Sequence, residues 1–334
     1  MFSPIEISKI QSLLVPTNKI VILTHYNPDG DAIGSSLGLK HFLQAKGLQA
    51  EVVVPNDFPK FLKWMPDAKK HIIAEYKRMK AKELVFDADV IFCLDFNASH
   101  RIGIVGPWLE NAKGVKILID HHQQPEEFDF VYSDTSLPAT CQMVYHFIEA
   151  LDEENLINED IAQCLYTGIM TDTGGFRFRS TSATTHRIIA NLIECGADPS
   201  TITSNTWDTN TVSRLQLLAL VLSRMEVVAD GQAAILYLTR QELHQYGFEK
   251  GDTEGFVNYG LSISGVQVSA FFMEDLYEDF IKISFRSKGN IDMNTFSRNY
   301  FNGGGHINAS GGRSNDTMEN TLVNFKEKVN ELFV

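Results

Sequence analysis

Apolar and polar residues alternate along the first part of the chain in a way typical of parallel strands joined by helical crossovers. The stretches between the apolar runs are amphipathic, and one that begins near Ile33 ends at Gly47, a common stop for a helix. The pattern therefore predicts an α/β domain with a doubly wound, mostly parallel sheet. Its predicted strands are 19–25 (KIVILTH), 50–54 (AEVVV), 89–96 (DVIFCLDF) and 115–122 (VKILIDHH).

The chain becomes helical after Asp134, where apolar residues recur at spacings of three and four. These helices, predicted at 140–151, 159–173 and 183–197, should complete a first domain that spans residues 1–200. A linker region, 201–225, overlaps a further predicted helix at 213–228.

Residues 226–334 predict a smaller α/β domain with a mixed, largely antiparallel sheet, because short apolar runs here alternate with turns. Its predicted strands are 232–239, 266–274 and 280–287, and its predicted last helix is 317–333.

Composition supports two domains, since 334 residues with 44% hydrophobic content can supply two cores. The four cysteines form no CxxC pair, which argues against a disulfide framework or a thiolate zinc site. The first residues lack the pattern of a signal peptide, and no apolar stretch is long enough to span a membrane. We therefore predict a cytoplasmic location and no membrane partner.

The net charge of −13 disfavours long duplex nucleic acids, whose binding proteins usually spread basic residues over many phosphates. A nucleic-acid substrate should accordingly be short and single-stranded. A solvated acidic surface without any functional meaning is the more ordinary explanation of this charge, so the charge alone decides little.

Acidic and imidazole residues follow three predicted strands at the ends where the chain leaves the sheet. His25 ends the first strand, Asp95 the third, and Asp120, His121 and His122 the fourth. Ligands of open parallel sheets bind beyond the carboxyl ends of the strands. We therefore expect these side chains to meet at one edge of the sheet.

Three more aspartates are predicted to join this edge. Asp29 and Asp31 lie in the turn NPDGDAIGS, where Pro28 and Gly30 favour a tight loop, and Asp172 lies where a helical run meets two glycines (TDTGG). Clustered carboxylates repel one another unless cations compensate their charge, and oxygen and nitrogen ligands suit manganese, then magnesium, cobalt or zinc. Two such ions can lower the pKa of a water between them, and the resulting hydroxide would attack phosphorus.

Each of these residues has an ordinary structural explanation when taken alone. An aspartate after a strand commonly caps a helix, and a histidine is more often hydrogen-bonded than metal-bound. Their joint order, HxxxDxD, a strand-terminal aspartate, DHH and TDTGG, instead favours a metal site.

These four motifs resemble those of the DHH phosphoesterase superfamily, and FNGGGHINASGG (301–312) resembles the glycine-rich signature of the DHH-associated C-terminal domain. The resemblance spans nearly the whole chain. It implies that His25 and Asp29 bind one metal, that Asp31, His121 and Asp172 bind a second, and that Asp95 bridges the two. It further implies that Asp120 supports the neighbouring imidazoles and that His122 faces the phosphate, so that His122, Asp120 and Asp95 serve catalysis.

The second domain predicts an anion site. Gly303, Gly304 and Gly305 offer main-chain N–H groups without side chains, His306 adds a donor, and Arg286 could clamp a phosphate through two hydrogen bonds. A plain tight turn and a surface arginine are the alternatives. Arg101 matches a position where related proteins place a substrate-contacting arginine, and a solvated surface arginine is nearly as good an interpretation.

Among members of the superfamily, the short two-domain layout most resembles the NrnA-type enzymes, which degrade very short oligoribonucleotides and remove the 3′-phosphate from adenosine 3′,5′-bisphosphate. This resemblance implies a hydrolase of nano-RNA or nucleoside bisphosphate. An exopolyphosphatase or pyrophosphatase is one alternative, and a non-catalytic nucleotide sensor is another. The sequence leaves a homodimer open.

Overall fold

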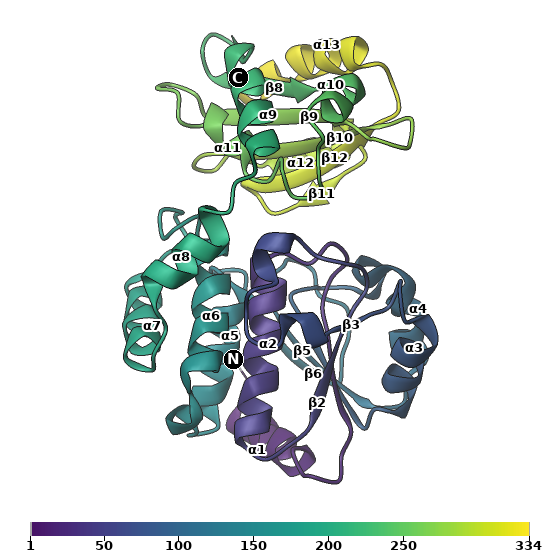
Figure 1. Ribbon diagram of the computed structural model, residues 1–334, viewed down its shortest axis with the longest axis vertical. Coiled ribbons are helices and arrows are strands. Elements are labelled where there is room, and N and C mark those ends of the chain that lie inside the picture. The colour runs from purple at the N-terminus through teal and green to yellow at the C-terminus, as the bar shows by residue number, and fades with distance from the viewer. Residues whose placement is uncertain (1, 334) are drawn as a thin grey trace. The chain divides into compact units, whose positions relative to one another are not determined.

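The computed structural model describes residues 2–333, which form two compact units, the first ending at Thr209 and the second beginning at Asn210 (Figure 1). The region 201–225 holds the end of helix α8 (Pro199–Trp207) in the first unit and helix α9 (Val212–Ser223) in the second.

The first unit is built on a sheet of six parallel strands in the order β3-β2-β1-β4-β5-β6. This confirms the predicted doubly wound α/β class and the four predicted strands; the short edge strands β3 and β6 were not predicted. The strands are β1 (Ile20–Leu23), β2 (Ala50–Val54), β3 (Ile72–Ile73), β4 (Val90–Leu94), β5 (Val115–Asp120) and β6 (Phe130–Ser133).

Helices cover both faces of this sheet, which explains why its central strands are apolar at every position. In β1, Ile20 and Ile22 face one core, whereas Val21 and Leu23 face the other. The first core is covered by α1 (Pro4–Leu13), α2 (Gly30–Ala45), α5 (Thr140–Ala150), α6 (Glu159–Asp172) and α7 (Ala183–Glu194). The second is covered by α3 (Arg78–Asp87) and α4 (Gly106–Asn111).

Helices α2 and α6 lie unusually close together because glycines line their contact (Figure 1). A Cβ atom on Gly34 of α2 would lie 2.6 Å from the carbonyl oxygen of Cys164, and one on Gly168 of α6 would lie 3.1 Å from the Cα of Asp31. The backbones can therefore approach to distances that any side chain would prevent. This contact brings Asp31, in the first turn of α2, beside the end of α6.

Strand order reverses at β1, whose neighbours are β2 on one side and β4 on the other. The chain first builds outward to β3 and then returns to β4. Connections therefore diverge above the carboxyl ends of β1 and β4, and this is the position where open α/β sheets bind ligands.

The second unit contains a six-stranded mixed sheet in the order β11-β12-β10-β9-β8-β7, antiparallel except for the parallel pair β8–β9. The strands are β7 (Glu226–Val228), β8 (Ala233–Leu238), β9 (Val268–Glu274), β10 (Ile281–Ser287), β11 (Gly304–Gly305) and β12 (Ala309–Ser314). Its other helices are α10 (Arg240–Gln245), α11 (Phe256–Gly260), α12 (Met293–Tyr300) and α13 (Met318–Val329). The predicted mixed, largely antiparallel sheet is thereby confirmed.

One predicted helix boundary was wrong. The helix expected over 213–228 ends at Ser223, and residues 226–228 form the edge strand β7, which pairs with β8. Single-turn 3-10 helices lie at Lys60–Leu62, Ala68–Lys70, Glu154–Leu156 and Asn330–Phe333, with a longer kinked one at Ser99–Val105. Within residues 2–333, no helix has the length and apolar character needed to cross a membrane.

Candidate metal centre

The predicted site residues lie at the carboxyl ends of the central strands. Asp95 directly follows β4, His121 directly follows β5, and His25 lies two residues beyond β1. Asp29 caps helix α2, since its Oδ1 accepts hydrogen bonds at 3.1 Å from the main-chain N–H groups of Asp31 and Ala32. Asp29 therefore does cap a helix, as a lone aspartate after a strand commonly does, but the cap uses only Oδ1. Its Oδ2 can still bind a metal ion.

The six residues predicted to bind metal come together as two groups that share Asp95. His25 Nε2 lies 3.4 Å from Asp95 Oδ2 and 3.7 Å from Asp29 Oδ1. His121 Nε2 lies 3.5 Å from Asp95 Oδ1 and 3.8 Å from Asp31 Oδ2. Within each group, one potential ligand atom per residue lies within 4.8 Å of the others. The two oxygens of one carboxylate therefore face two separate sets of ligands.

Asp172, the last residue of α6, adds a carboxylate to the second group. Its Oδ2 lies 3.4 Å from His121 Nε2. The helix ends here because Gly174 and Gly175 follow with φ values of 58° and 75°. The break predicted at TDTGG thus places a carboxylate at the half-buried end of helix α6.

Asp95 adopts an unusual backbone conformation for a residue with a side chain, with φ at 63°. A non-glycine residue in this left-handed region costs on the order of 1–3 kcal/mol, and such strain concentrates at functional sites. Its side chain is nearly fully buried and accepts a hydrogen bond at 3.0 Å from the hydroxyl of Thr140. The conformation points the carboxylate between the two imidazoles.

Main-chain groups hold both imidazoles so that Nε2 faces the carboxylates. His25 Nδ1 lies 2.9 Å from the carbonyl oxygen of Tyr26, and His121 Nδ1 lies 3.2 Å from that of Leu137. A donated Nδ1–H fixes the ring and leaves Nε2 as the lone-pair nitrogen, as a metal ligand requires.

Sequence reasoning missed the residues that hold Asp31. Its two oxygens accept hydrogen bonds from the main-chain N–H groups of Thr140, at 2.6 Å, and Cys141, at 2.8 Å, in the first turn of α5. The N-terminus of a helix offers such N–H groups to an anion. The only local signal was the start of a helical run at Thr140, which says nothing about a partner more than a hundred residues earlier in the chain.

The protonation behaviour of the cluster shows an excess of negative charge. Burial, together with the charges of Asp95 and Asp172, raises the pKa of Asp31 well above its usual value. Burial likewise raises the pKa of Asp172 to about 7. Although burial alone would lower the pKa of His25, hydrogen bonds to Asp29 and Asp95 raise it well above the usual value. The cluster therefore attracts positive charge, and its nitrogen and oxygen donors fit a divalent cation.

Asp120 and His122 form a pair beside these groups. His122 Nδ1 lies 2.7 Å from Asp120 Oδ1, and the main-chain N–H of His122 donates to Asp120 Oδ2 at 3.1 Å. Asp120 is fully buried. It had been expected to support both neighbouring imidazoles; the structure shows this contact for His122, whereas His121 Nδ1 is held by the carbonyl of Leu137.

Arg101 lies on the loop that packs against the end of β1. Its carbonyl oxygen accepts a hydrogen bond of 2.8 Å from the N–H of Tyr26, the residue after His25. The main chain of the half-buried Arg101 thus lies next to the residue that follows His25, and contact of its side chain with a substrate stays a prediction.

The substrate residues predicted in the second unit lie on neighbouring strands. Arg286 of β10 pairs with Ala309 of β12, and Gly305 of β11 pairs with the next residue, Ser310. His306 begins a turn that is closed by two main-chain hydrogen bonds with Ala309. The N–H of His306 donates to the carbonyl oxygen of Ala309, and the N–H of Ala309 donates to the carbonyl oxygen of His306. The half-buried Arg286 and His306 therefore lie near the same end of this sheet.

Gly303 shows why the loop must be glycine-rich. A Cβ atom there would lie 1.8 Å from the carbonyl oxygen of Gly311 and 2.1 Å from Ser297 Oγ. Only a glycine allows this approach.

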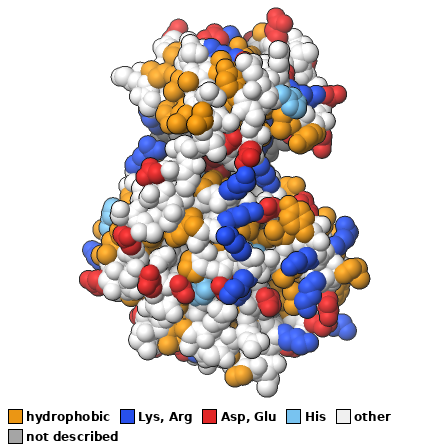
Figure 2. All heavy atoms as spheres, viewed as in Figure 1, with side chains coloured by type: hydrophobic (Ala, Val, Ile, Leu, Met, Phe, Trp, Pro, Cys, Tyr) orange, Lys and Arg blue, Asp and Glu red, His pale blue; other side chains and the backbone are white. Residues whose placement is uncertain are grey.

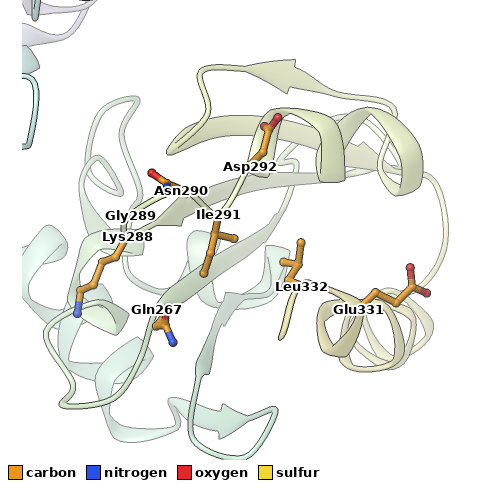
Figure 3. Close-up of a pocket in the computed structure, with 8 residues that line it drawn as sticks. All are labelled: Gln267, Lys288, Gly289, Asn290, Ile291, Asp292, Glu331 and Leu332. Atoms are coloured by element: carbon orange, nitrogen blue, oxygen red, sulfur yellow. The ribbon is translucent and has the colours of Figure 1, made fainter. Parts of the chain in front are cut away.

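The second unit also contains an open pocket of 580 Å³, and none of the residues that line it was predicted as a site residue (Figure 3). It is lined by Gln267, Lys288, Gly289, Asn290, Ile291, Asp292, Glu331 and Leu332. It contains two carboxylates and one lysine, so it has no excess of positive charge for a phosphate. The pocket is therefore poorly suited to a phosphate, and an anion site at the glycine-rich loop stays a prediction.

The fold and the cluster define a phosphoesterase of the DHH family, and the chain belongs to that family. Residues 19–169 match the DHH family, N-terminal domain, and residues 230–334 match the DHHA1 domain.

The chain is similar to the bifunctional oligoribonuclease and PAP phosphatase NrnA of Thermus thermophilus, with 34% identity over 87% of this chain and 83% of that protein. The NrnA protein of Bacillus subtilis is 26% identical over 87% of this chain and 88% of its own length. Among solved structures, an exopolyphosphatase-related protein from Bacteroides fragilis has a TM-score of 0.94 and 41% identity, covering 98% of this chain and 96% of its own.

The exonuclease RecJ bound to manganese has the same general fold, with a TM-score of 0.52 and 12% identity, covering 99% of this chain and 94% of its own.

Proposed function

We propose that this protein hydrolyses very short oligoribonucleotides and removes the 3′-phosphate from adenosine 3′,5′-bisphosphate. The observation that carries the proposal is the pair of ligand groups that share Asp95. Relatives of matching length and domain content, named as oligoribonuclease and PAP phosphatase, support this choice of substrates.

The metal site in this proposal holds two divalent ions, with manganese first and magnesium or cobalt as alternatives, since the donors are carboxylates and imidazoles. Bound ions of this kind lower the pKa of a water and offset charge on a phosphate. His25 and Asp29 would hold one ion, Asp31, His121 and Asp172 the other, and Asp95 would contact both.

The remaining residues act on the substrate. Asp120 holds His122 by two hydrogen bonds, which fixes the ring and directs Nε2 away from Asp120 toward a phosphate oxygen. Arg101 contributes charge at the same sheet edge. In the second unit, Arg286 and His306, beside the loop of Gly303, Gly304 and Gly305, would bind a second phosphate of the substrate. The N–H groups of Gly303 and Gly305 already donate hydrogen bonds, to the carbonyl oxygen of Ser297 and to Asn294 Oδ1, so these glycines act by leaving space for the phosphate.

The distribution of charge supports a short substrate. Acidic and basic side chains are interspersed over the visible face of the first unit, and the net charge is −13 (Figure 2). A surface of this kind lacks the broad positive field that long duplexes require.

Incubation of the manganese-loaded protein with RNAs of two to five nucleotides, and separately with the bisphosphate, tests this function. We expect release of mononucleotides and of phosphate. An Asp172→Ala variant should lose orders of magnitude in turnover together with bound metal, whereas His122→Ala should lose turnover and keep metal. Absence of product from both substrates would refute the proposal.

A second candidate, hydrolysis of inorganic phosphate chains, is favoured by the 41% identity to a protein described as exopolyphosphatase-related. Release of phosphate from polyphosphate, compared with release from the bisphosphate under equal conditions, separates the two. Tight nucleotide binding without turnover in manganese would instead favour a sensor. The cytoplasmic location and the homodimer stay predictions.

A further inference from the structure

Asn294, on helix α12, connects the glycine-rich loop to an arginine. Its side chain is only 8% exposed. Its Oδ1 accepts two hydrogen bonds, one of 3.0 Å from the N–H of Gly305 and one of 3.1 Å from Nε of Arg298, one turn later in the helix. A single oxygen therefore fixes both the loop and the arginine.

The guanidinium of Arg298 lies alongside the loop. A Cβ atom added to Gly304 would lie 3.6 Å from Arg298 Nε and 4.0 Å from its Nη2. Because Gly304 has no side chain, this face of the guanidinium borders directly on the main chain of the predicted anion site. The arginine is exposed, and only its Nε is engaged by Asn294.

Three other arginines of this unit have carboxylate partners, whereas Arg214 donates its hydrogen bonds to Asn210 and to main-chain carbonyl groups. Arg224 pairs with Glu242, Arg240 with Asp279 and Arg313 with Glu278. No described carboxylate lies within ion-pair distance of Arg298. An oriented, exposed guanidinium beside a loop that carries no side chain at Gly304 is suited to a ligand that brings its own negative charge.

We propose that Arg298 is a specificity-determining residue that contacts the phosphate which is retained during the reaction, and that Asn294 is the positioning residue that holds it there. The inference rests on the proposed function, because it requires a substrate with a second phosphate at the glycine-rich loop. It adds an arginine that the motifs did not indicate, and it assigns to this arginine the discrimination between substrates with two phosphates and substrates with one.

The experiment compares adenosine 3′,5′-bisphosphate with adenosine 3′-monophosphate, which has the same scissile group and lacks the 5′-phosphate. For Arg298→Ala we expect KM for the bisphosphate to rise about tenfold to a hundredfold, which is the loss typical of a charge-assisted hydrogen-bond pair. The kcat for the bisphosphate, and kcat/KM for the monophosphate, should stay near those of the wild type.

Arg313→Ala is the matched control, because it removes the same charge from an exposed arginine on β12 of the same unit. We expect it to leave both substrates unaffected. Arg298→Lys should lie between wild type and Arg298→Ala, since it keeps the charge and loses the bond to Asn294.

Two further variants test the geometry. Asn294→Ala should raise KM for the bisphosphate selectively, and the double variant Asn294→Ala/Arg298→Ala should be little worse than Arg298→Ala if the asparagine acts through the arginine. In Gly304→Ala the new Cβ would make only ordinary contacts of 3.5–4.0 Å, so the variant should fold. It should still weaken binding of the bisphosphate, because the methyl group would lie against the guanidinium.

Binding of adenosine 5′-monophosphate, measured by calorimetry with a chelator present, gives a readout independent of turnover. We expect Arg298→Ala to weaken the binding of adenosine 5′-monophosphate by about the same factor by which it raises KM for the bisphosphate. The inference would be overturned if the wild type hydrolyses the bisphosphate in preference to the monophosphate and Arg298→Ala keeps the same preference. That result would leave the proposed function standing. A wild-type protein that hydrolyses neither adenosine substrate nor short RNA would overturn the proposed function itself.

Discussion

Asp120 holds His122 at two points, through Nδ1 of the ring at 2.7 Å and through the main-chain N–H at 3.1 Å. This arrangement orients a histidine beside the metal cluster. Replacing one oxygen by an NH₂ group in Asp120→Asn would weaken the hold on the ring without removing a predicted metal ligand. We expect kcat to fall about tenfold to a hundredfold, as is typical when a buried partner of a site histidine is changed.

Steady-state kinetics and metal content together check this prediction. Asp152→Asn, an equal change at an exposed position after α5, serves as the control and should be without effect. Loss of metal from Asp120→Asn would show that the aspartate supports the ligands and not His122.

Metal affinity should depend on pH because of Asp172, whose pKa burial raises to about 7 in the absence of metal. Below that pH a proton must leave the carboxyl group before it can bind a cation, so affinity should decrease as the pH falls from 8 to 6. Titration calorimetry with Mn²⁺ at pH 6, 7 and 8 measures this affinity. In Asp172→Asn, affinity should be lower at every pH, and its change between pH 7 and 6 should be smaller than in the wild type; equal slopes would contradict the assignment.

Gly168→Ala should damage the fold and the site together. The new Cβ would lie 2.1 Å from Cys141 Sγ and 3.0 Å from Asp31 Oδ1. Overpacking of this kind costs about 1–3 kcal/mol, and the shift should also weaken metal binding through Asp31. All three tryptophans, Trp64, Trp108 and Trp207, belong to the first unit, so their fluorescence in urea reports its unfolding.

The double variant Gly168→Ala/Cys141→Ala separates the two effects, because it removes the clashing sulfur and keeps the contact with Asp31. Stability should largely return while metal affinity stays reduced. Recovery of both would mean that the glycine serves packing alone.

His71 should make the first unit less stable in mild acid. It is 5% exposed, both ring nitrogens lack hydrogen-bond partners among the described residues, and burial, with Lys40 and His41 nearby, lowers its pKa to about 3 against the opposing effect of Asp67. Between pH 6.5 and 3 the unfolded chain therefore binds a proton that the folded chain does not. Stability is full above pH 6.5 and decreases by up to about 1.4 kcal/mol per pH unit below it.

Replacing the ring by Leu removes this titration. The change in unfolding free energy between pH 7 and pH 5 should be about 2 kcal/mol smaller in His71→Leu than in the wild type. Equal changes in both proteins, followed by tryptophan fluorescence in urea, would show that His71 does not remain neutral when folded.

The strand-end half of the metal cluster was predictable because His25, Asp95 and His121 follow strands. Asp95 and His121 end apolar runs of the sequence, and the parallel arrangement of these runs requires their carboxyl ends to meet. The contacts of Asp31 with Thr140 and Cys141 were not predictable, because they depend on how closely α2 packs against α5 and α6. The glycines at 30, 34 and 38 were a sequence signal for that packing, and it was not used.

The second unit was harder to predict where its strands lack side-chain pattern. Strand β12 reads ASGGRS and has no alternation of apolar and polar residues, so it is defined by its pairing with β10 and β11. Strand β7 continues an apolar helical run and differs from it only by its pairing with β8. Both errors arise where tertiary pairing, and not local preference, determines the backbone.

The left-handed backbone of Asp95 limits which residues can replace it. Asparagine and glycine tolerate a φ of 63° far better than alanine or any branched side chain does. An Asp95→Ala variant would therefore lose the carboxylate and strain the backbone at once, so that a loss of its activity could come from either change. Asp95→Asn avoids that confusion, because it keeps the shape and the backbone while removing one negative charge from between the two groups, and it is the natural starting point for trapping an uncleaved substrate.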